Sequence, residues 1–398
     1  MHILQVAPYY PPAYAYGGIP RIVGSLSREL THHGHTVSVI TTDAHDNAKR
    51  SERILYQRED GVHIYTTPNL SNRLAFQEQL YLPIVSRQYF TAIQSHGPVD
   101  VIHLHGHRHL LNNAVIRWAK HHQIPYVFTA NGTLRRHEQK EWIKIAWDAC
   151  ISGRIPFEAD RCIVVSQSDA TIHREWGLSS EKLRYIPNGL DLTELQIPPV
   201  NSTLRSQYNI PESSPIISYL GRISPRKGVD ILIQAFQQLN SHPTAHLIVA
   251  GSDMGGLSPS IQLAQNNPRI HFIGTIEGDA RLDLLHNSDV IVYPSQREIF
   301  GLVPFEALIA GTPVIVSDDC GCGEIIQRAD AGFVVPYGEI HQLSQRISEL
   351  LYTPSLGRAM VDKGQRYIQK HLSIEIVTTE HIALYNEIRR TKPNTYEH

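Results

Sequence analysis

The chain has 398 residues, which is long for one hydrophobic core and sufficient for two domains of about 190 residues each. Its formal net charge is −2, so the composition gives no reason to expect nucleic acid or another polyanion as a partner. Four cysteines are too few for a disulfide framework, and no apolar run reaches the roughly 18 residues of a membrane-spanning helix. The first residues enter a strand directly, without the regions of a signal peptide. These features predict a soluble, cytoplasmic protein.

The N-terminal half opens with a strand, a glycine turn and a helix. Residues 3–7 are an apolar run, Gly17 and Gly18 follow a loop rich in proline and tyrosine, and a helix then runs to about residue 34. A second strand is predicted at residues 35–40. This βαβ opening lacks the Gly-x-Gly-x-x-Gly fingerprint, which disfavours a dinucleotide-dependent dehydrogenase. A tight turn that needs positive φ explains the two glycines equally well.

Histidines occupy every second position from His103 to His109, after a predicted strand that begins near residue 99. Alternate residues of a strand share one face, so four imidazoles could line up as a zinc or nickel site. Gly106 is expected to end the strand, however, and no carboxylate or thiol supplements the cluster nearby. We therefore predict no metal site here.

Residues 135–147 are predicted to form a helix with a basic side and two tryptophans. Such a helix could lie on a membrane surface or approach an anionic acceptor. Its mixed charges, which include Glu138 and Glu141, favour an ordinary solvated face.

The second half begins with a strand at residues 216–220 that leads into a basic loop. Arg222, Arg226 and Lys227 lie within six residues of one another in this loop. Arginine forms two-pronged contacts with phosphate oxygens and lysine supplies a movable charge, so the loop is predicted to bind phosphate.

A second candidate stretch follows the apolar strand predicted at residues 289–293. Phe300-Gly301-Leu302 should form a strand-to-helix turn before a short helix at residues 303–310, where free backbone N–H groups suit an anion. Glu298 precedes this helix and Glu306 lies about one turn inside it. Neither has a lysine or arginine four residues later. They are either two solvated acids or acceptors for the hydroxyls of a sugar nucleotide.

Three further features complete the reading of the chain. Cys320-x-Cys322 is a poor zinc site without a second thiol pair, and a glycine-rich turn is the better interpretation. Residues 339–351 and 373–389 are predicted to be helical. The turn at Asn188-Gly189 marks a domain boundary just before the proline- and serine-rich residues 196–215.

Glu298 and Glu306, with seven residues between them that include Phe300-Gly301, resemble the signature of retaining GT-B glycosyltransferases of family four, the group 1 glycosyl transferases. Gly221-Arg222 with Lys227-Gly228, and Ile186-Pro187-Asn188-Gly189, resemble further segments of that family. The resemblance implies an α/β fold with two Rossmann-like β/α/β domains facing a central cleft. It places an acceptor-side domain at residues 1–192 and a donor-binding domain at residues 193–372. The helix at about 373–390 is then expected to pack back on the first domain.

The resemblance also implies a reaction. A sugar would pass from a nucleoside diphosphate sugar to a hydroxyl of a glycan, lipid-linked or small-molecule acceptor, with retained configuration, on one face and without a metal or cofactor. Arg222, Lys227 and Glu298 would be catalytic, with the two cations on the leaving diphosphate and the glutamate on the transferred sugar. A UDP-sugar is favoured over a GDP-sugar, and polysaccharide biosynthesis is the expected setting. The donor-binding residues implied are Gly17, Gly18, Arg222, Lys227, Glu298, Phe300, Gly301, Leu302 and Glu306, the last of which would hold the ribose.

Two further residues are candidates for contact with the acceptor or the donor sugar. The resemblance implies that His105 faces the cleft, although it could equally be a packed histidine. Asn131 stands where family members usually carry a histidine, and asparagine cannot titrate. This departure supports one alternative, a catalytically inactive sugar-nucleotide-binding protein. A sugar-nucleotide epimerase of the same fold is the other alternative. The base, the sugar, the acceptor, the oligomeric state and a peripheral contact with the inner face of the membrane stay open.

Overall fold

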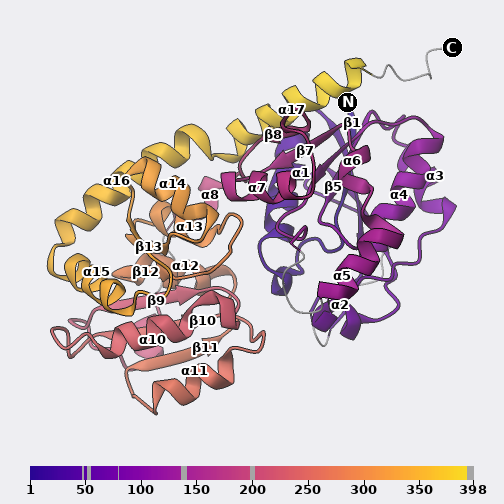
Figure 1. Ribbon diagram of the computed structural model, residues 1–398. Helices are drawn as coiled ribbons and strands as arrows, with labels where there is room; N and C mark the ends of the chain where they lie inside the picture. Colours follow the sequence, from indigo (N-terminus) through magenta and orange to yellow (C-terminus); the bar gives the residue numbers. More distant parts are fainter. Residues whose placement is uncertain (47–48, 52–54, 79, 136–140, 198–201, 392–398) are drawn as a thin grey trace. The chain divides into compact units, whose positions relative to one another are not determined.

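The computed structural model describes residues 1–46, 49–51, 55–78, 80–135, 141–197 and 202–391. The chain divides into two compact units, one formed by Met1–Gly189 together with the segment from Ile374 onward, the other by Leu190–Ser373. The boundary follows the Asn188-Gly189 turn directly. Figure 1 shows the elements of both units along the chain. None of the described helices is long and apolar enough to cross a membrane.

The first unit is built on one sheet with the strand order β3-β4-β2-β1-β5-β6-β7-β8 in the described part of the chain. Every strand pair is parallel except β3 with β4, which is antiparallel. The strands are β1 His2–Val6, β2 Thr36–Thr42, β3 Tyr56–Glu59, β4 Val62–Thr67, β5 Val101–His105, β6 Tyr126–Thr129, β7 Arg161–Val164 and β8 Leu183–Tyr185.

Helices connect these strands, as expected for a parallel sheet. They are α1 Ile19–His32, α2 Asn72–Glu78, α3 Arg87–Gln94, α4 Leu110–His121, α5 Glu141–Trp147, α6 Ile155–Glu158 and α7 Gln167–Glu175, with short 3₁₀ turns at Tyr14–Tyr16 and Ser180–Lys182 and a π-helix at Asp148–Ser152.

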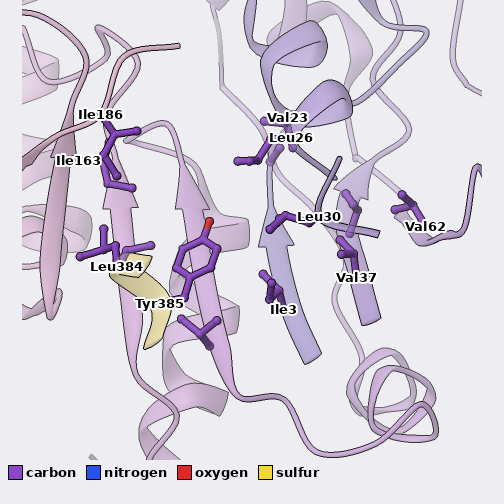
Figure 2. Packing of buried hydrophobic residues seen from close by; sticks show 14 of the residues in the cluster. Ile3, Val23, Leu26, Leu30, Val37, Val62, Ile163, Ile186, Leu384 and Tyr385 are labelled. Atoms are coloured by element: carbon purple, nitrogen blue, oxygen red, sulfur yellow. The ribbon is translucent and has the colours of Figure 1, made fainter. Parts of the chain in front are cut away.

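The last helix, α17 Ile374–Thr391, completes the core of the first unit. Its buried residues recur at helical spacing and join the apolar cluster that contains β1 and α1. Figure 2 shows Leu384 and Tyr385 of α17 in the same cluster as Ile3 of β1 and Leu30 of α1. Full burial of a leucine such as Leu384 contributes roughly 1.5–3 kcal/mol, so the C-terminal segment is an integral part of this unit.

The second unit has an all-parallel sheet with the order β11-β10-β9-β12-β13-β14. The chain moves outward from β9 to β10 and β11 and then returns to the other side of β9 with β12. Connections from the carboxyl ends of β9 and β12 therefore leave in opposite directions, and ligands of open α/β sheets bind at such a switch point. The strands are β9 Ile216–Leu220, β10 His246–Ala250, β11 Ile270–Gly274, β12 Val290–Tyr293, β13 Val314–Ser317 and β14 Phe333–Val335.

The helices of the second unit complete a Rossmann-like pattern. They are α8 Leu192–Leu195, α9 Leu204–Gln207, α10 Val229–Gln237, α11 Leu257–Ala264, α12 Gly278–Asn287, α13 Val303–Ile309, α14 Gly321–Ala329, α15 Ile340–Tyr352 and α16 Pro354–His371, with a 3₁₀ turn at Pro225–Lys227.

Several elements differ from the sequence-based expectation. The edge strand β3 and helix α2 lie in a part of the chain for which the sequence analysis predicted no element. Helix α16 was not predicted. Its Gly357 and Gly364 weaken the helical signal, but they let α16 approach Pro313 and Leu308 closely: a Cβ at Gly364 would lie 2.8 Å from Leu308. Helix α5 is described at Glu141–Trp147, inside the helix predicted at residues 135–147, and residues 136–140 of that helix lie outside the described residues.

Candidate active site

Two loops meet at the switch point of the second unit, and one glycine makes their approach possible. Gly228 has φ +66°, and a Cβ at this position would lie 2.1 Å from the carbonyl oxygen of Pro294. No larger residue fits there. The backbone N–H of Gln296 donates to the carbonyl of Arg226 at 2.8 Å, which joins the basic loop after β9 to the loop after β12. Lys227 and Glu298 are thereby brought together.

Lys227, Glu298 and Tyr293 form a closed triangle of polar contacts. Lys227 Nζ forms an ion pair with Glu298 Oε2 and donates a hydrogen bond to the Tyr293 hydroxyl at 3.1 Å. The Tyr293 hydroxyl in turn donates to Glu298 Oε2 at 3.0 Å. The Lys227 and Glu298 side chains are 13% and 24% exposed, so ligands can reach the pair although most of it is removed from water.

The electrostatics of the triangle fix its protonation. Burial acts to raise the pKa of Glu298, but the Lys227 ammonium, the Arg222 charge and the Tyr293 hydrogen bond together outweigh it and lower that pKa to about 2. Burial and the neighbouring Glu298 carboxylate hold the pKa of Tyr293 far above its usual range. At neutral pH the site thus combines an ionised carboxylate and a neutral phenol.

Arg222 lies half-buried on the same basic loop. Its backbone is fixed by the Tyr219 hydroxyl, which donates to the Arg222 carbonyl at 2.8 Å. Within the described ranges no carboxylate forms an ion pair with the Arg222 guanidinium. Its positive charge helps to lower the pKa of Glu298. The switch point therefore carries two cations beside one carboxylate, an arrangement suited to a ligand with an anionic part and a hydroxyl-bearing part.

Glu306 has a different environment from that of Glu298. It is 4% exposed on α13, and its Oε1 lies 2.5 Å from Nη2 of Arg281 on α12. Neither glutamate has a lysine or arginine four residues later, as the sequence shows, but Lys227 and Arg281 reach Glu298 and Glu306 from other elements of the fold.

In the turn at residues 300–302, backbone N–H groups rather than side chains are available for contact with a ligand. Phe300 is 3% exposed and packs on Phe305, with ring centroids 5.2 Å apart. Gly301 has φ +76°, and a Cβ there would lie 3.1 Å from Cys322 Sγ. Within the described part of the chain, the N–H groups of Gly301 and Leu302 meet no protein acceptor. They are available to an anion.

The candidate residues of the first unit lie in three different settings. Gly17 has φ +104°, which a larger residue rarely adopts, whereas Gly18 has φ −78° and begins α1 in an ordinary conformation. Asn131 has φ +50°, and its buried carboxamide oxygen and nitrogen have no hydrogen-bond partner among the described residues. Unpaired buried amides are costly, so Asn131 is a strong candidate for contact with a ligand.

His105 is a packed histidine in this structure. It is 1% exposed, its Nε2 lies 2.7 Å from Gln5 Oε1, and its ring lies 3.9 Å from that of His103. Burial lowers the pKa of His105 to about 3, so the imidazole is neutral. His103, His105 and His381 line a small pocket inside the first unit, with room for about one water molecule.

The residue patterns that suggested metal ligands serve other roles. Gly106, with φ +81°, ends β5, and His107 then pairs with Asp148 at 3.1 Å rather than with the other histidines. Cys320 and Cys322 are buried free thiols whose sulfurs lie 3.1 Å apart. Across the described ranges, no group of three or more histidine, cysteine or acidic residues is arranged to hold a metal ion.

Sequence reasoning missed Tyr219, Tyr293 and Arg281. The two tyrosines lie on β9 and β12, next to the switch point, and their rings are parallel at 6.2 Å. Their place at the ends of predicted parallel strands was a usable signal. Arg281 carried no such signal, because its partner is reached only through the packing of α12 against α13.

Comparison with known proteins supports the assignment suggested by these two units. The family model described as "Glycosyl transferases group 1" matches residues 200–367, and the model described as "Glycosyltransferase Family 4" matches residues 16–194. Together they span most of the chain. This protein belongs to the group 1, family four GT-B glycosyltransferases.

Several relatives of this glycosyltransferase match it along nearly their whole length. A glycogen synthase of Mycobacterium tuberculosis is 26% identical over 98% of this chain and 95% of its own. Among solved structures, sucrose-phosphate synthase of Thermosynechococcus elongatus superposes with a TM-score of 0.77 at 22% identity, covering 98% of this chain and 100% of its own. HepE of Anabaena, solved with UDP-glucose, superposes with a TM-score of 0.73 at 19% identity, covering 97% of this chain and 100% of its own. The protein is an enzyme that transfers a sugar from a donor, built on two Rossmann-like domains.

Proposed function

We propose that this glycosyltransferase moves a sugar from a nucleoside diphosphate sugar to an acceptor hydroxyl with retained anomeric configuration and without a metal ion. The observation that carries the proposal is the cluster at the switch point of the second unit. There Lys227 and Arg222 offer positive charge beside the carboxylate of Glu298.

The chemistry follows from the charges of these three residues. As the bond between the anomeric carbon and the diphosphate oxygen breaks, negative charge grows on the leaving diphosphate. Arg222 and Lys227 stabilise that charge, and a preorganised donor of this kind typically contributes about 3–4 kcal/mol to the transition state. Glu298 accepts a hydrogen bond from a hydroxyl of the transferred sugar. The acceptor oxygen attacks on the face that the diphosphate leaves, and its proton passes to a leaving phosphate oxygen.

Glu306 and Asn131 have supporting roles in this proposal. Glu306, held by Arg281, accepts hydrogen bonds from the ribose hydroxyls of the donor. Asn131 uses its unpaired carboxamide to bind the transferred sugar or the acceptor. Neither role requires a titratable group, so replacement of the family's usual histidine by Asn131 is compatible with activity.

Two arginine or lysine charges can do the work that a divalent cation does in other transferases, which is why a metal is not invoked. A UDP-sugar is the first donor to test, because a protein of this fold has been solved with UDP-glucose. The acceptor is proposed to be a carbohydrate or lipid-linked hydroxyl in polysaccharide biosynthesis in the cytoplasm.

A donor screen with variants tests this function. The purified protein is combined with UDP- and GDP-sugars in EDTA, and thermal stability and nucleotide release are followed for wild type, Glu298→Ala and Lys227→Ala. We expect one donor to stabilise the wild type and to be turned over, with both variants losing turnover. Stabilisation without turnover by any acceptor or water would favour an inactive sugar-nucleotide-binding protein. Release of a free epimerised sugar nucleotide would favour an epimerase.

A peripheral membrane contact is proposed for α5 and the π-helix that follows it. The exposed positions 142, 145, 146, 149 and 150 are all apolar or cysteine at helical spacing, with Trp142 74% and Ile145 47% exposed. Asp148 faces inward instead and pairs with Arg108 at 2.8 Å. An outward apolar stripe containing tryptophan fits the interfacial region of a bilayer.

Vesicle flotation tests this contact with matched variants. Trp142→Ser combined with Ile145→Ser should abolish binding to vesicles that contain anionic lipid. Ile197→Ser, at a residue 63% exposed in the other unit, should leave binding unchanged. Equal binding by all three proteins would refute the contact.

A further inference from the structure

The Tyr293 hydroxyl contacts both Lys227 and Glu298, to which the proposed function gives different tasks. In the structure Lys227 and Glu298 bind each other, whereas in the reaction Lys227 is needed at the diphosphate and Glu298 at the sugar. An incoming diphosphate carries more negative charge than one carboxylate, so it competes with Glu298 for the ammonium. Glu298 would then lose its cation in a largely buried position, which is costly unless another donor remains.

The two oxygens of Glu298 are not equivalent. Oε2 accepts from both Lys227 Nζ and the Tyr293 hydroxyl. Oε1 meets no protein donor within the described residues, and the side chain is 24% exposed. The carboxylate is thus anchored through one oxygen and presents the other to a ligand.

We propose that Tyr293 is a positioning residue, whose hydroxyl keeps Glu298 Oε2 in place when Lys227 engages the donor diphosphate, so that Oε1 stays aimed at the transferred sugar. This inference rests on the proposed function and adds a residue to its machinery. Tyr293 would act through Glu298 and would not itself touch the donor.

The surroundings of Tyr293 suit it to this task. It is the last residue of β12, 5% exposed, with its ring parallel to that of Tyr219. A rigid strand end and a stacked neighbour hold the hydroxyl in one place. The pKa of the phenol lies far above its usual range because of burial and the adjacent carboxylate, so it remains a hydrogen-bond donor at neutral pH.

A double-mutant cycle distinguishes positioning from packing. Tyr293→Phe removes only the hydroxyl, and a hydrogen bond to a charged group is worth about a ten- to hundredfold effect. We expect Tyr293→Phe to lower the kcat of donor turnover by that factor while the Kd of the bare nucleoside diphosphate changes less than about twofold. In a Glu298→Gln background the same substitution should cause almost no further loss. In a Lys227→Met background its effect should be about the same as in wild type, because in the reacting complex Lys227 no longer holds Glu298.

The control is Tyr352→Phe, which removes a hydroxyl that is bonded to the Ser241 carbonyl at 3.4 Å and belongs to an exposed side chain of the same unit. It should leave turnover unchanged. Thermal unfolding of each variant confirms that the unit is folded. Two results would overturn the role of Tyr293 without affecting the proposed function. One is that Tyr293→Phe lowers kcat by the same factor in the Glu298→Gln background as in wild type. The other is that Tyr293→Phe weakens binding of nucleoside diphosphate and of nucleotide sugar equally. A wild-type enzyme that binds no nucleotide sugar would overturn the proposed function itself.

Discussion

Replacing Lys227 with methionine tests the charge balance of the candidate site most sharply. Methionine keeps much of the length of the side chain and removes the ammonium. The leaving diphosphate then loses one of two cations, and removal of one such donor typically costs about 3–4 kcal/mol, or 10²–10³ in rate. The helix α13 contributes only about 0.3–2 kcal/mol through its dipole, so it cannot compensate. Nucleotide release from the donor, measured at saturating concentration, should fall by that factor.

The same substitution should also change stability in a pH-dependent way. The pKa of Glu298 is about 2 in the folded protein, against an ordinary 4.5, so the pair contributes stability that is present above about pH 4.5 and lost as the pH falls towards 2. This difference corresponds to roughly 3 kcal/mol at neutral pH as an upper limit. Lys227→Met should therefore lower the unfolding free energy at pH 7 and much less at pH 2–3. Adding Glu298→Gln should restore stability, because no buried charge is left unpaired, but not turnover.

Lys363→Met is the matched control for this experiment. Lys363 forms an exposed ion pair with Asp330 in the same unit, and such pairs contribute about 0–1 kcal/mol. Its turnover and its unfolding free energy should stay near those of wild type. Wild-type turnover in Lys227→Met would refute the role given to the ammonium. Unchanged stability at both pH values would refute the burial argument.

Three further predictions concern other parts of the molecule. Arg281→Met should lower the unfolding free energy in chemical denaturation by about 3–5 kcal/mol, because it leaves Glu306 buried without its cation. The double variant Arg281→Met with Glu306→Gln should regain much of the lost unfolding free energy. Asn131→His should add a titration to the pH profile of kcat near pH 6–7, where we expect the wild-type profile to be flat. A flat profile in the variant would place residue 131 away from the reacting groups. Burial lowers the pKa of His381 to about 4, so the neutral imidazole contributes stability above about pH 6.5 that is lost as the pH falls towards 4. The Tm of His381→Leu should therefore fall less steeply than that of wild type over this pH range. An unchanged slope would contradict the argument.

Much of this site was predictable because its charged residues lie in two short stretches of the sequence. The basic loop with Arg222 and Lys227 follows one buried strand, and the loop with Glu298 follows another. Parallel strands place such loops at one edge of a sheet, so their proximity could be expected from the order of elements. The family resemblance rested on these same residues, and the comparisons with known proteins confirm it.

The partners of these residues were not predictable because they depend on tertiary packing. The sequence around Glu306 gives no indication that Arg281 is its partner, because the contact depends on the packing of α12 beside α13. His105 is a second case: the family resemblance implied that it faces the cleft, with a packed histidine as the alternative, and its contact with Gln5 of the neighbouring β1 is made only in the folded sheet. Helix α16 was not predicted because Gly357 and Gly364 lower its helix propensity, and the sequence alone does not show that these glycines allow close helix contacts.

The anomeric configuration of the sugar released from the donor tests the central claim most directly, and it requires no knowledge of the acceptor. The enzyme is incubated with its donor in EDTA, and proton NMR follows the first sugar formed by slow transfer to water. The account predicts release with the anomeric configuration of the donor and loss of release in Lys227→Met. Initial release of the opposite anomer, or release that requires an added divalent metal, would contradict it.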